Sequence, residues 1–170
     1  MIYTKIRNVK SPARSNPTDA GIDFFVPAYD ADIALAVHEK SMKVQSITSS
    51  EITMAPGDNI LIPLGIKVMV DSGTALVAFN KSGVASKKGL LTGACCVDQG
   101  YEGEVHLNLI NPTSETQTIE WDNKLIQFLQ LKIDQHMPTE ITTEEYEELC
   151  KLENVNSSRG AGGFGSTGTA

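Results

Sequence analysis

The segment Arg159–Gly168 combines residue types that bind nucleotides. Five glycines surround one arginine, one phenylalanine, one serine and one threonine. A guanidinium group pairs with phosphate oxygens in a bidentate way, a phenyl ring stacks on a base, and glycine amides with hydroxyl groups can surround a polyphosphate. Glycine-rich segments are also typical of mobile linkers, because burying them seldom offsets the entropy of ordering them. The segment alone supports either interpretation.

Two internal segments carry charged groups that a nucleotide site would use. In Asp19–Asp23, a strand-like pattern places Asp23 inside a strand, where a buried carboxylate needs a partner. A solvated aspartate at a sheet edge is the alternative. In Lys81–Gly89, a lysine, the Ser82 hydroxyl and the Gly83 amide can together bind an anion, although a basic surface turn has the same composition.

Two further segments each contain a polar residue that could belong to a binding site. Asp98 begins the turn Asp98-Gln99-Gly100 and could act as a general base, or it is an ordinary turn residue. Glycines on both sides of this turn leave backbone amides and carbonyls that could recognise the edge of a base. Gln127 interrupts an apolar strand pattern, so it faces either a partner or solvent.

Charge and cysteine content exclude several classes of protein. The formal net charge is −7, whereas a protein that coats nucleic acid needs a basic face to release counterions. A phosphorylated small molecule is still possible, since a few local cations and a metal ion can hold it. Three cysteines without a CxxC pair make a disulfide framework or a zinc site unlikely to form. The three histidines are scattered and are predicted to be surface or packing residues.

Targeting signals are not recognisable in the sequence. No apolar run approaches membrane-spanning length, and the first residues lack the apolar core of a signal peptide. We therefore expect a cytoplasmic protein that binds neither membrane nor nucleic acid.

Short alternating segments separated by turn signals predict a mostly β fold, a jelly-roll-like antiparallel barrel or sandwich. Two hairpins are predicted. One joins Leu90–Val97 to Tyr101–Ile110 around Asp98, and the other joins Gln117–Trp121 to Lys124–Ile133 around Asp122-Asn123. The predicted strands are Ile2–Val9, Gly21–Ala28, Asn59–Val70, Thr74–Phe79, Leu90–Val97, Tyr101–Ile110, Gln117–Trp121 and Lys124–Ile133.

One short helix is predicted from Thr142 onward, because Thr142 and Glu145 have the spacing of a capping box. The segment Tyr29–Ser50 has weak periodicity and is predicted to be an excursion with its own strands. We expect residues 1–153 to form the β domain, with the excursion at about 29–50, and residues 154–170 to form a flexible glycine-rich lid.

Taken in order, these segments resemble the five motifs of the trimeric deoxyuridine triphosphatases (dUTPases), from about Ala13 to Thr169. The most specific elements are Asp98-x-x-Tyr101-x-Gly103 and the tail that begins at Arg159. The resemblance implies a β jelly roll that assembles as a homotrimer with active sites shared between subunits. It also implies hydrolysis of dUTP to dUMP and pyrophosphate, which limits uracil in DNA and supplies dUMP.

The resemblance assigns a role to each motif. Asp98 would activate the water that attacks the α-phosphorus, and Mg²⁺ would be held mainly by the triphosphate and water, with no metal ligands from the protein. Tyr101 would pack on the deoxyribose and exclude a 2′-hydroxyl, the main chain near Cys95 and His106 would bind uracil, and Asp23 would support the site. The remaining substrate-binding residues would be Lys81, Ser82, Gly83, Gln127, Arg159, Phe164, Gly165, Ser166 and Thr167.

The sequence departs from the family pattern in four places. Lys81 stands where the second motif usually has arginine, Asp122-Asn123 opens the fourth motif, and Cys95-Cys96 replaces smaller or aliphatic residues. The excursion at Tyr29–Ser50 is longer than the usual link between the first two motifs. It is either an interaction surface or a neutral surface loop, and the neutral loop is slightly favoured.

The sequence leaves two alternatives to dUTP hydrolysis. A dCTP deaminase has a related fold but needs a glutamate base, which the pattern around Asp98 does not favour. A regulatory protein that uses the nucleotide as a switch is supported only by the long excursion.

Overall fold

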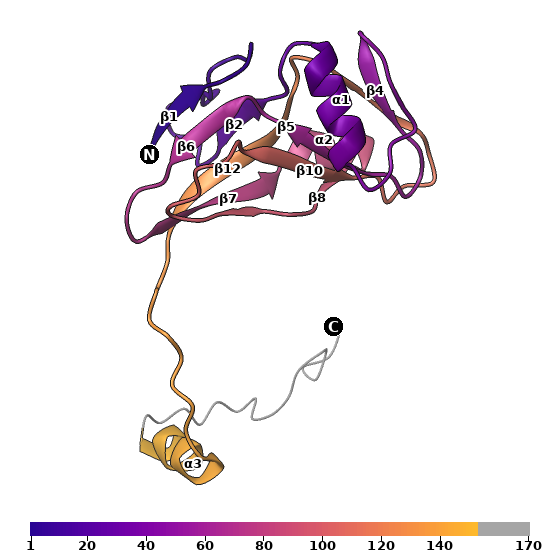
Figure 1. Cartoon of the computed structure of the whole chain (residues 1–170). Helices are drawn as coiled ribbons and strands as arrows, with labels where there is room; N and C mark the ends of the chain where they lie inside the picture. The colour runs from indigo at the N-terminus through magenta and orange to yellow at the C-terminus, as the bar shows by residue number, and fades with distance from the viewer. Residues whose placement is uncertain (153–170) are drawn as a thin grey trace. The chain divides into compact units, whose positions relative to one another are not determined.

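Antiparallel strand pairing builds the larger part of the structure, a computed structural model that describes residues 1–152 (Figure 1). The strands belong to one compact unit, Met1–Asp134. The described elements are β1 (Ile2–Lys5), β2 (Ile22–Phe25), α1 (Ala31–Lys40), β3 (Ser46–Ile47), β4 (Glu51–Met54), β5 (Asn59–Pro63), β6 (Ile66–Met69), β7 (Thr74–Asn80), α2 (Ser82–Lys88), β8 (Leu91–Thr92), β9 (Cys96–Val97), β10 (His106–Ile110), β11 (Gln117–Glu120), β12 (Lys124–Lys132) and α3 (Thr143–Leu152).

The strands form small antiparallel sheets, which confirms the predicted mostly β fold. Their orders are β1-β6, β5-β10-β8, β11-β4-β3 and β2-β12-β7-β9. Side chains alternate between core and surface, as Ile60 and Ile62 of β5 and Leu107 and Leu109 of β10 do. The rings of Phe24 and Phe128 lie 4.6 Å apart in the same core. Burial of these apolar side chains supplies the main favourable free energy of the fold.

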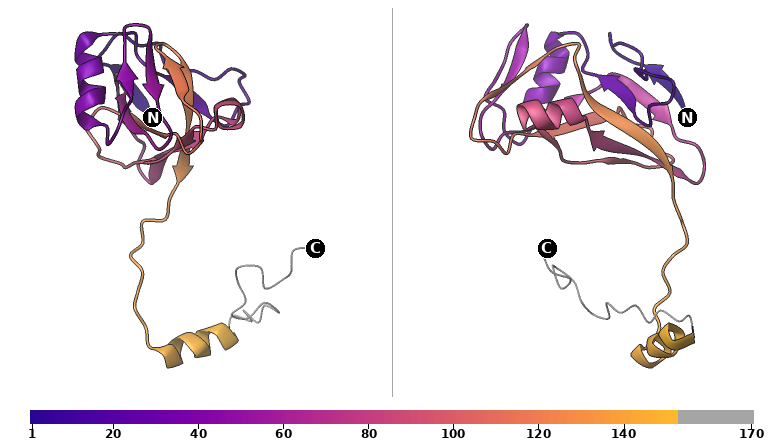
Figure 2. Two further views of the ribbon diagram at one scale, coloured as in Figure 1. Left: turned by 90° about the vertical axis from the view of Figure 1, so that its right-hand side faces the viewer. Right: turned by 180° about the vertical axis from the view of Figure 1, so that it is seen from behind.

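The sequence analysis predicted one short helix, which corresponds to α3. Among the described residues, α1 and α2 form as well, so the predicted number of helices was too small. The excursion, where strands were expected, contains the short strand β3 but also helix α1. Its N-cap Asp30 accepts a hydrogen bond from the Asp32 amide, and Ile33 and Val37, one turn apart, are buried. α1 packs on β5 along the outside of the sheets (Figures 1 and 2). The aspartate cap and the four-residue apolar spacing are the signals that would have predicted this helix.

Neither predicted hairpin forms as expected. β11 pairs with β4, whereas β12 lies between β2 and β7, so these neighbours in sequence join different sheets. Near Asp98, β9 pairs with β7, while β10 pairs with β5 and β8. The segment Asn59–Val70 is also divided, because Gly65 at φ +67° ends β5 and lets β6 pair with β1. Alternation predicts strands but does not fix their partners.

Helix α3 belongs to a second compact unit, which begins at Gln135. The predicted capping box is confirmed: the Glu145 amide donates to Thr142 Oγ1 at 3.2 Å, and the Thr142 amide donates to Glu145 Oε2 at 2.8 Å. The predicted lid lies outside the described residues, and the division at 153/154 stays a prediction. Within residues 1–152, no helix is both long and apolar enough to span a membrane.

Candidate active site

A cavity of about 320 Å³ brings four predicted site residues together. Cys95, Asp98, Tyr101 and His106 all line it. Cys95 directly precedes β9, Asp98 and Tyr101 belong to the turn that follows it, and His106 is the first residue of β10. The rest of the lining is Leu61, Ala94, Cys96, Val97, Glu104, Val105 and Phe128.

Asp98 is presented to solvent by the turn at the end of β9. The Tyr101 amide donates to the Asp98 carbonyl at 3.2 Å, and Gly100 has φ +85°, which favours glycine. Asp98 Oδ1 accepts a hydrogen bond from the Cys96 thiol at 3.5 Å. Burial, together with the hydrogen bond and charge of Asp98, raises the pKa of Cys96. The thiol therefore stays protonated and remains a donor to this carboxylate.

The Tyr101 ring folds back over the turn. Its hydroxyl donates to the Glu104 carbonyl at 3.0 Å. A Cβ atom at Gly103 would overlap the ring and hydroxyl of Tyr101. Glycine in Asp98-x-x-Tyr101-x-Gly103 is thus explained by the space that the tyrosine side chain needs.

Glu104 anchors the other end of this turn, a role that the sequence did not reveal. Its carboxylate accepts hydrogen bonds from Arg7 Nε at 2.8 Å, Arg7 Nη2 at 3.0 Å and the Gly65 amide at 2.7 Å. Burial acts to raise the pKa of Glu104, but these hydrogen bonds and the Arg7 charge outweigh it and the pKa is lowered. The ionised carboxylate ties the cavity to the N-terminal segment and to the bend between β5 and β6.

Asn108 fixes the chain that leads into the cavity. Its Oδ1 accepts from the Ala94 amide at 2.9 Å, and its Nδ2 donates to the Ile60 carbonyl at 3.0 Å. A Cβ atom at Gly93 would overlap the Asn108 amide. Sequence reasoning missed Asn108, although it interrupts an apolar strand just as Gln127 does.

Asp23 lies at the centre of a second cluster, on β2. It is only 5% exposed and forms ion pairs with Lys81 and with Lys124, whose Nζ lies 2.9 Å from Asp23 Oδ2. The buried interpretation of Asp23 is therefore correct, and the solvated edge aspartate is wrong. Burial acts to raise the pKa of Asp23, but hydrogen bonds and charges from the two lysines outweigh it and lower the pKa.

Gln127 faces a partner within the chain, as one of its two interpretations predicted. Its Nε2 donates to the Asn80 carbonyl at 2.9 Å, directly before Lys81. A Cβ atom at Gly21 would overlap Gln127 Oε1. The first, second and fourth motifs thus meet at the Asp23 cluster.

The Asp23 cluster and the cavity are separated within one chain. Strand register aligns Asp23 with Gln127 and Phe79 across β2, β12 and β7, whereas Val97 of β9 pairs with Leu76. Asp23 and Val97 are therefore three residues apart along the strand direction, roughly 10 Å, and three strand spacings apart across the sheet, roughly 14 Å. The two groups of motif residues therefore do not line one cavity within a single chain.

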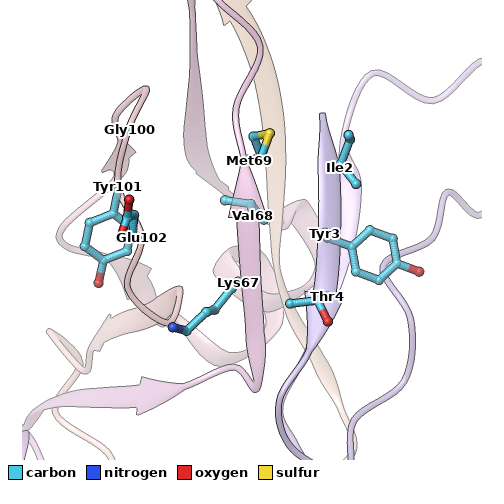
Figure 3. A pocket seen from close by; sticks show the side chains of 9 residues that line it. All are labelled: Ile2, Tyr3, Thr4, Lys67, Val68, Met69, Gly100, Tyr101 and Glu102. Atoms are coloured by element: carbon cyan, nitrogen blue, oxygen red, sulfur yellow. The ribbon is translucent and has the colours of Figure 1, made fainter.

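A larger cavity has a volume of about 490 Å³ (Figure 3). It is bounded by Gly100–Glu102 and by β1 and β6. Of the predicted site residues that the structure describes, it includes Tyr101 alone, and its lining is mostly apolar. The smaller cavity, with four predicted residues, is the candidate active site.

Comparison with known proteins identifies the family. The dUTPase family model matches residues 46–168, well over half of the chain. The chain belongs to the dUTPase family. It is 31% identical over 166 residues to a deoxyuridine 5′-triphosphate nucleotidohydrolase of Shewanella sediminis (strain HAW-EB3), covering 95% of this chain and 99% of that protein.

Solved dUTPase structures share the fold. A mutant dUTPase of Staphylococcus bacteriophage 80alpha with dUpNHpp has a TM-score of 0.69 at 21% identity, covering 98% of this chain and 97% of that chain. A mutant dUTPase from phage phi11 of S. aureus, which coordinates a structural Mg(II) ion, has a TM-score of 0.64 at 18% identity, covering 82% and 95%. These likenesses support the jelly-roll-like architecture.

Several predicted dUTPase residues are not brought into the cavity. Lys81, Ser82, Gly83 and Gln127 are absent from its lining. Arg159, Phe164, Gly165, Ser166 and Thr167 lie outside the described residues. Within residues 1–152, no three His, Cys, Asp or Glu side chains are grouped to hold a metal ion.

Gly21→Ala is expected to destabilise the dUTPase fold by about 1–3 kcal/mol, because the added methyl group overlaps Gln127. Thermal unfolding measures the loss. The double variant Gly21→Ala/Gln127→Ala removes Oε1 and Cδ, the two closest overlapping atoms, so its loss should be smaller than the sum of the two single losses. Strict additivity would contradict the packing argument.

Acid is expected to weaken the fold through Asp23 and Glu104. Both have lowered pKa values in the folded state. Their contribution is therefore complete above the unfolded values of about 4 and is lost as the pH falls below them. We expect the contribution of these two carboxylates to the Tm to change little from pH 7 to pH 5 and to be lost below about pH 4, whereas His106, whose pKa is lowered, costs some stability below about pH 6.5. Asp23→Asn should have a lower Tm at pH 7 but a shallower acid slope; an unchanged slope would exclude Asp23 as a cause.

Proposed function

We propose that this protein hydrolyses dUTP to dUMP and pyrophosphate in the cytoplasm, which limits uracil in DNA and supplies dUMP. The observation that carries the proposal is the cavity in which Asp98, Tyr101, Cys95 and His106 come together. The names of the curated relatives support dUTP as the substrate.

Asp98 is the proposed general base. Its exposed carboxylate can accept a proton from a water molecule whose oxygen attacks the α-phosphorus. The new P–O bond forms as the bond from the α-phosphorus to the bridging oxygen breaks, and pyrophosphate leaves with that oxygen. Mg²⁺ bound to the triphosphate would neutralise phosphate charge. Cys96, as a donor to Asp98, would help to hold the carboxylate in place.

Selectivity is proposed to come from shape and from the backbone. The Tyr101 ring, held through Glu104, would pack against the deoxyribose and leave no room for a 2′-hydroxyl. Backbone groups near Cys95 and His106 would bind the uracil edge. A cytosine amino group would then face an unsuitable partner, which costs far more than a missing apolar contact.

The complete site is proposed to form in a homotrimer. The separation between the cavity and the Asp23 cluster within one chain supports this arrangement. Lys81, Ser82, Gly83 and Gln127 of one subunit would then bind phosphates of a nucleotide seated in the cavity of another. Asp23 would support this surface by holding Lys81.

A product assay tests the proposed function. Purified protein is incubated with Mg²⁺ and each deoxynucleoside triphosphate, and with UTP, while pyrophosphate, nucleoside monophosphate and ammonia are recorded. Pyrophosphate and dUMP from dUTP alone are expected. Ammonia from dCTP, or no product from any substrate, would overturn the proposal. Sedimentation in the same buffer should give three times the chain mass of 18.3 kDa; the mass of one chain would exclude the shared site.

A further inference from the structure

Helix α1, which fills the long excursion, reaches the candidate active site through one side chain. Lys40, the last residue of α1, places its Nζ 3.1 Å from His106 Nε2. His106 is half-buried and lines the cavity. The two residues are 66 positions apart in the sequence. The excursion is therefore in contact with the residue at which the base is proposed to bind.

The end of α1 is firmly attached beside the cavity. Directly after Lys40, the Ser41 hydroxyl accepts a hydrogen bond at 3.0 Å from the amide of Leu61, itself a lining residue. Met42 and Lys43 donate their amides to the Asn59 carbonyl at 3.1 Å and 3.2 Å. Because β5 pairs directly with β10, these bonds hold the backbone at the end of α1 beside the strand that carries His106.

The contacts of His106 determine the protonation of its ring. Nδ1 lies 2.7 Å from the Glu104 carbonyl, which can only accept, so Nδ1 carries the proton. The ammonium group of Lys40 can only donate, so Nε2 must be the acceptor. The ring is thus neutral, with both nitrogens engaged. Burial lowers the pKa of His106, and the charges of Lys40 and Arg7 act in the same direction, while the Glu104 carbonyl and carboxylate oppose them.

We propose that Lys40 is a positioning residue for the nucleobase pocket, acting through His106. By holding Nε2, Lys40 fixes the imidazole as a rigid wall of the cavity and leaves it without a donor or acceptor for the ligand. The base is then recognised by the main chain alone, beside a wall of constant shape. This inference rests on the proposed function and gives the excursion a role in substrate binding.

Steady-state kinetics with dUTP test the proposal. Lys40→Met should raise KM roughly 3- to 10-fold, the range expected for one lost hydrogen bond, with kcat nearly unchanged. Lys40→Arg, which keeps a cationic donor, should restore most of the binding. Lys5→Met is the matched control, since it also removes one charge and one hydrogen bond, but its partner is the Val9 carbonyl at 3.1 Å, and Val9 does not line the cavity as His106 does. Equal KM values for the Lys40→Met and Lys5→Met variants would overturn the proposal.

A second readout does not depend on catalysis. Nitrogen NMR of the His106 ring, assigned with His106→Gln, should show the Nδ1–H tautomer in the unaltered protein. In Lys40→Met the neutral ring should keep the Nδ1–H tautomer, because the Glu104 carbonyl still accepts from Nδ1, but the pKa of His106 should rise, because the donor to Nε2 and a positive charge are lost. An unchanged pKa would refute the link between Lys40 and His106. If the unaltered protein hydrolyses no dUTP, the proposed function fails, whereas this spectrum still decides whether Lys40 controls the ring.

Discussion

Replacing Asp98 with asparagine is expected to lower kcat by about 10²–10⁴-fold, the usual contribution of a general base. Asparagine has nearly the same shape but cannot take a proton from the attacking water. Asp98 is exposed and lies in a turn closed by main-chain atoms, so the fold should survive the change. Binding of the non-hydrolysable analogue dUpNHpp, measured by calorimetry, should persist while turnover is lost.

Glu102→Gln is the matched control for the Asp98 variant. It removes the same charge from the same turn, and Glu102 does not line the candidate active site. Its turnover should stay close to that of the unaltered protein. Full turnover by Asp98→Asn would remove Asp98 as the base, and equal losses in both variants would indicate a general charge effect.

Deleting Ser158–Ala170 is expected to lower kcat/KM by roughly 10²-fold or more, because the groups proposed to bind and orient the triphosphate are lost. Among the described residues, those lining the cavity include no lysine or arginine. Of the two lining carboxylates, Glu104 is neutralised by Arg7, whereas Asp98 adds negative charge. A triphosphate therefore needs cationic and amide donors from elsewhere, and Arg159 with the following glycines has the required chemistry.

The body of the fold should not depend on this deletion, so the Tm is the internal control. Removing only Thr169 and Ala170, beyond the glycine-rich segment, should leave activity intact. If the long deletion retained full activity, the lid assignment of this segment would be wrong. A large fall in Tm would instead indicate a structural role for the deleted residues.

Local sequence patterns predicted most of the strands, because alternation reflects which side chains are buried, although β4 (Glu51–Met54) was missed. Ile60, Ile62, Leu107 and Leu109 alternate in sequence and are buried in the structure. Strand partners were not predictable in this way. β11 and β12 are separated by three residues, and only contacts with β4, β2 and β7 place them in different sheets.

The cavity residues were predictable as a set, since Asp98, Tyr101, Cys95 and His106 lie close together in sequence. Their supporting contacts were not. Arg7 and Glu104 are 97 positions apart, and no spacing rule connects them. The same holds for Lys40 and His106, which meet only because α1 packs on β5. Short-range motifs thus identify reactive groups, whereas the groups that hold them are set by the tertiary fold.

The position of β12 has a consequence for how the chain is made. This strand lies between β2 and β7, yet it leaves the ribosome about a hundred residues after β2. Until then, β2 and β7 each lack a neighbour on the side that β12 will occupy. Pairing over so long a separation is intrinsically slow, since the loop entropy is lost before the contacts form. During synthesis, the sheet that carries Asp23 and Gln127 is therefore completed by the last strand of the body to emerge.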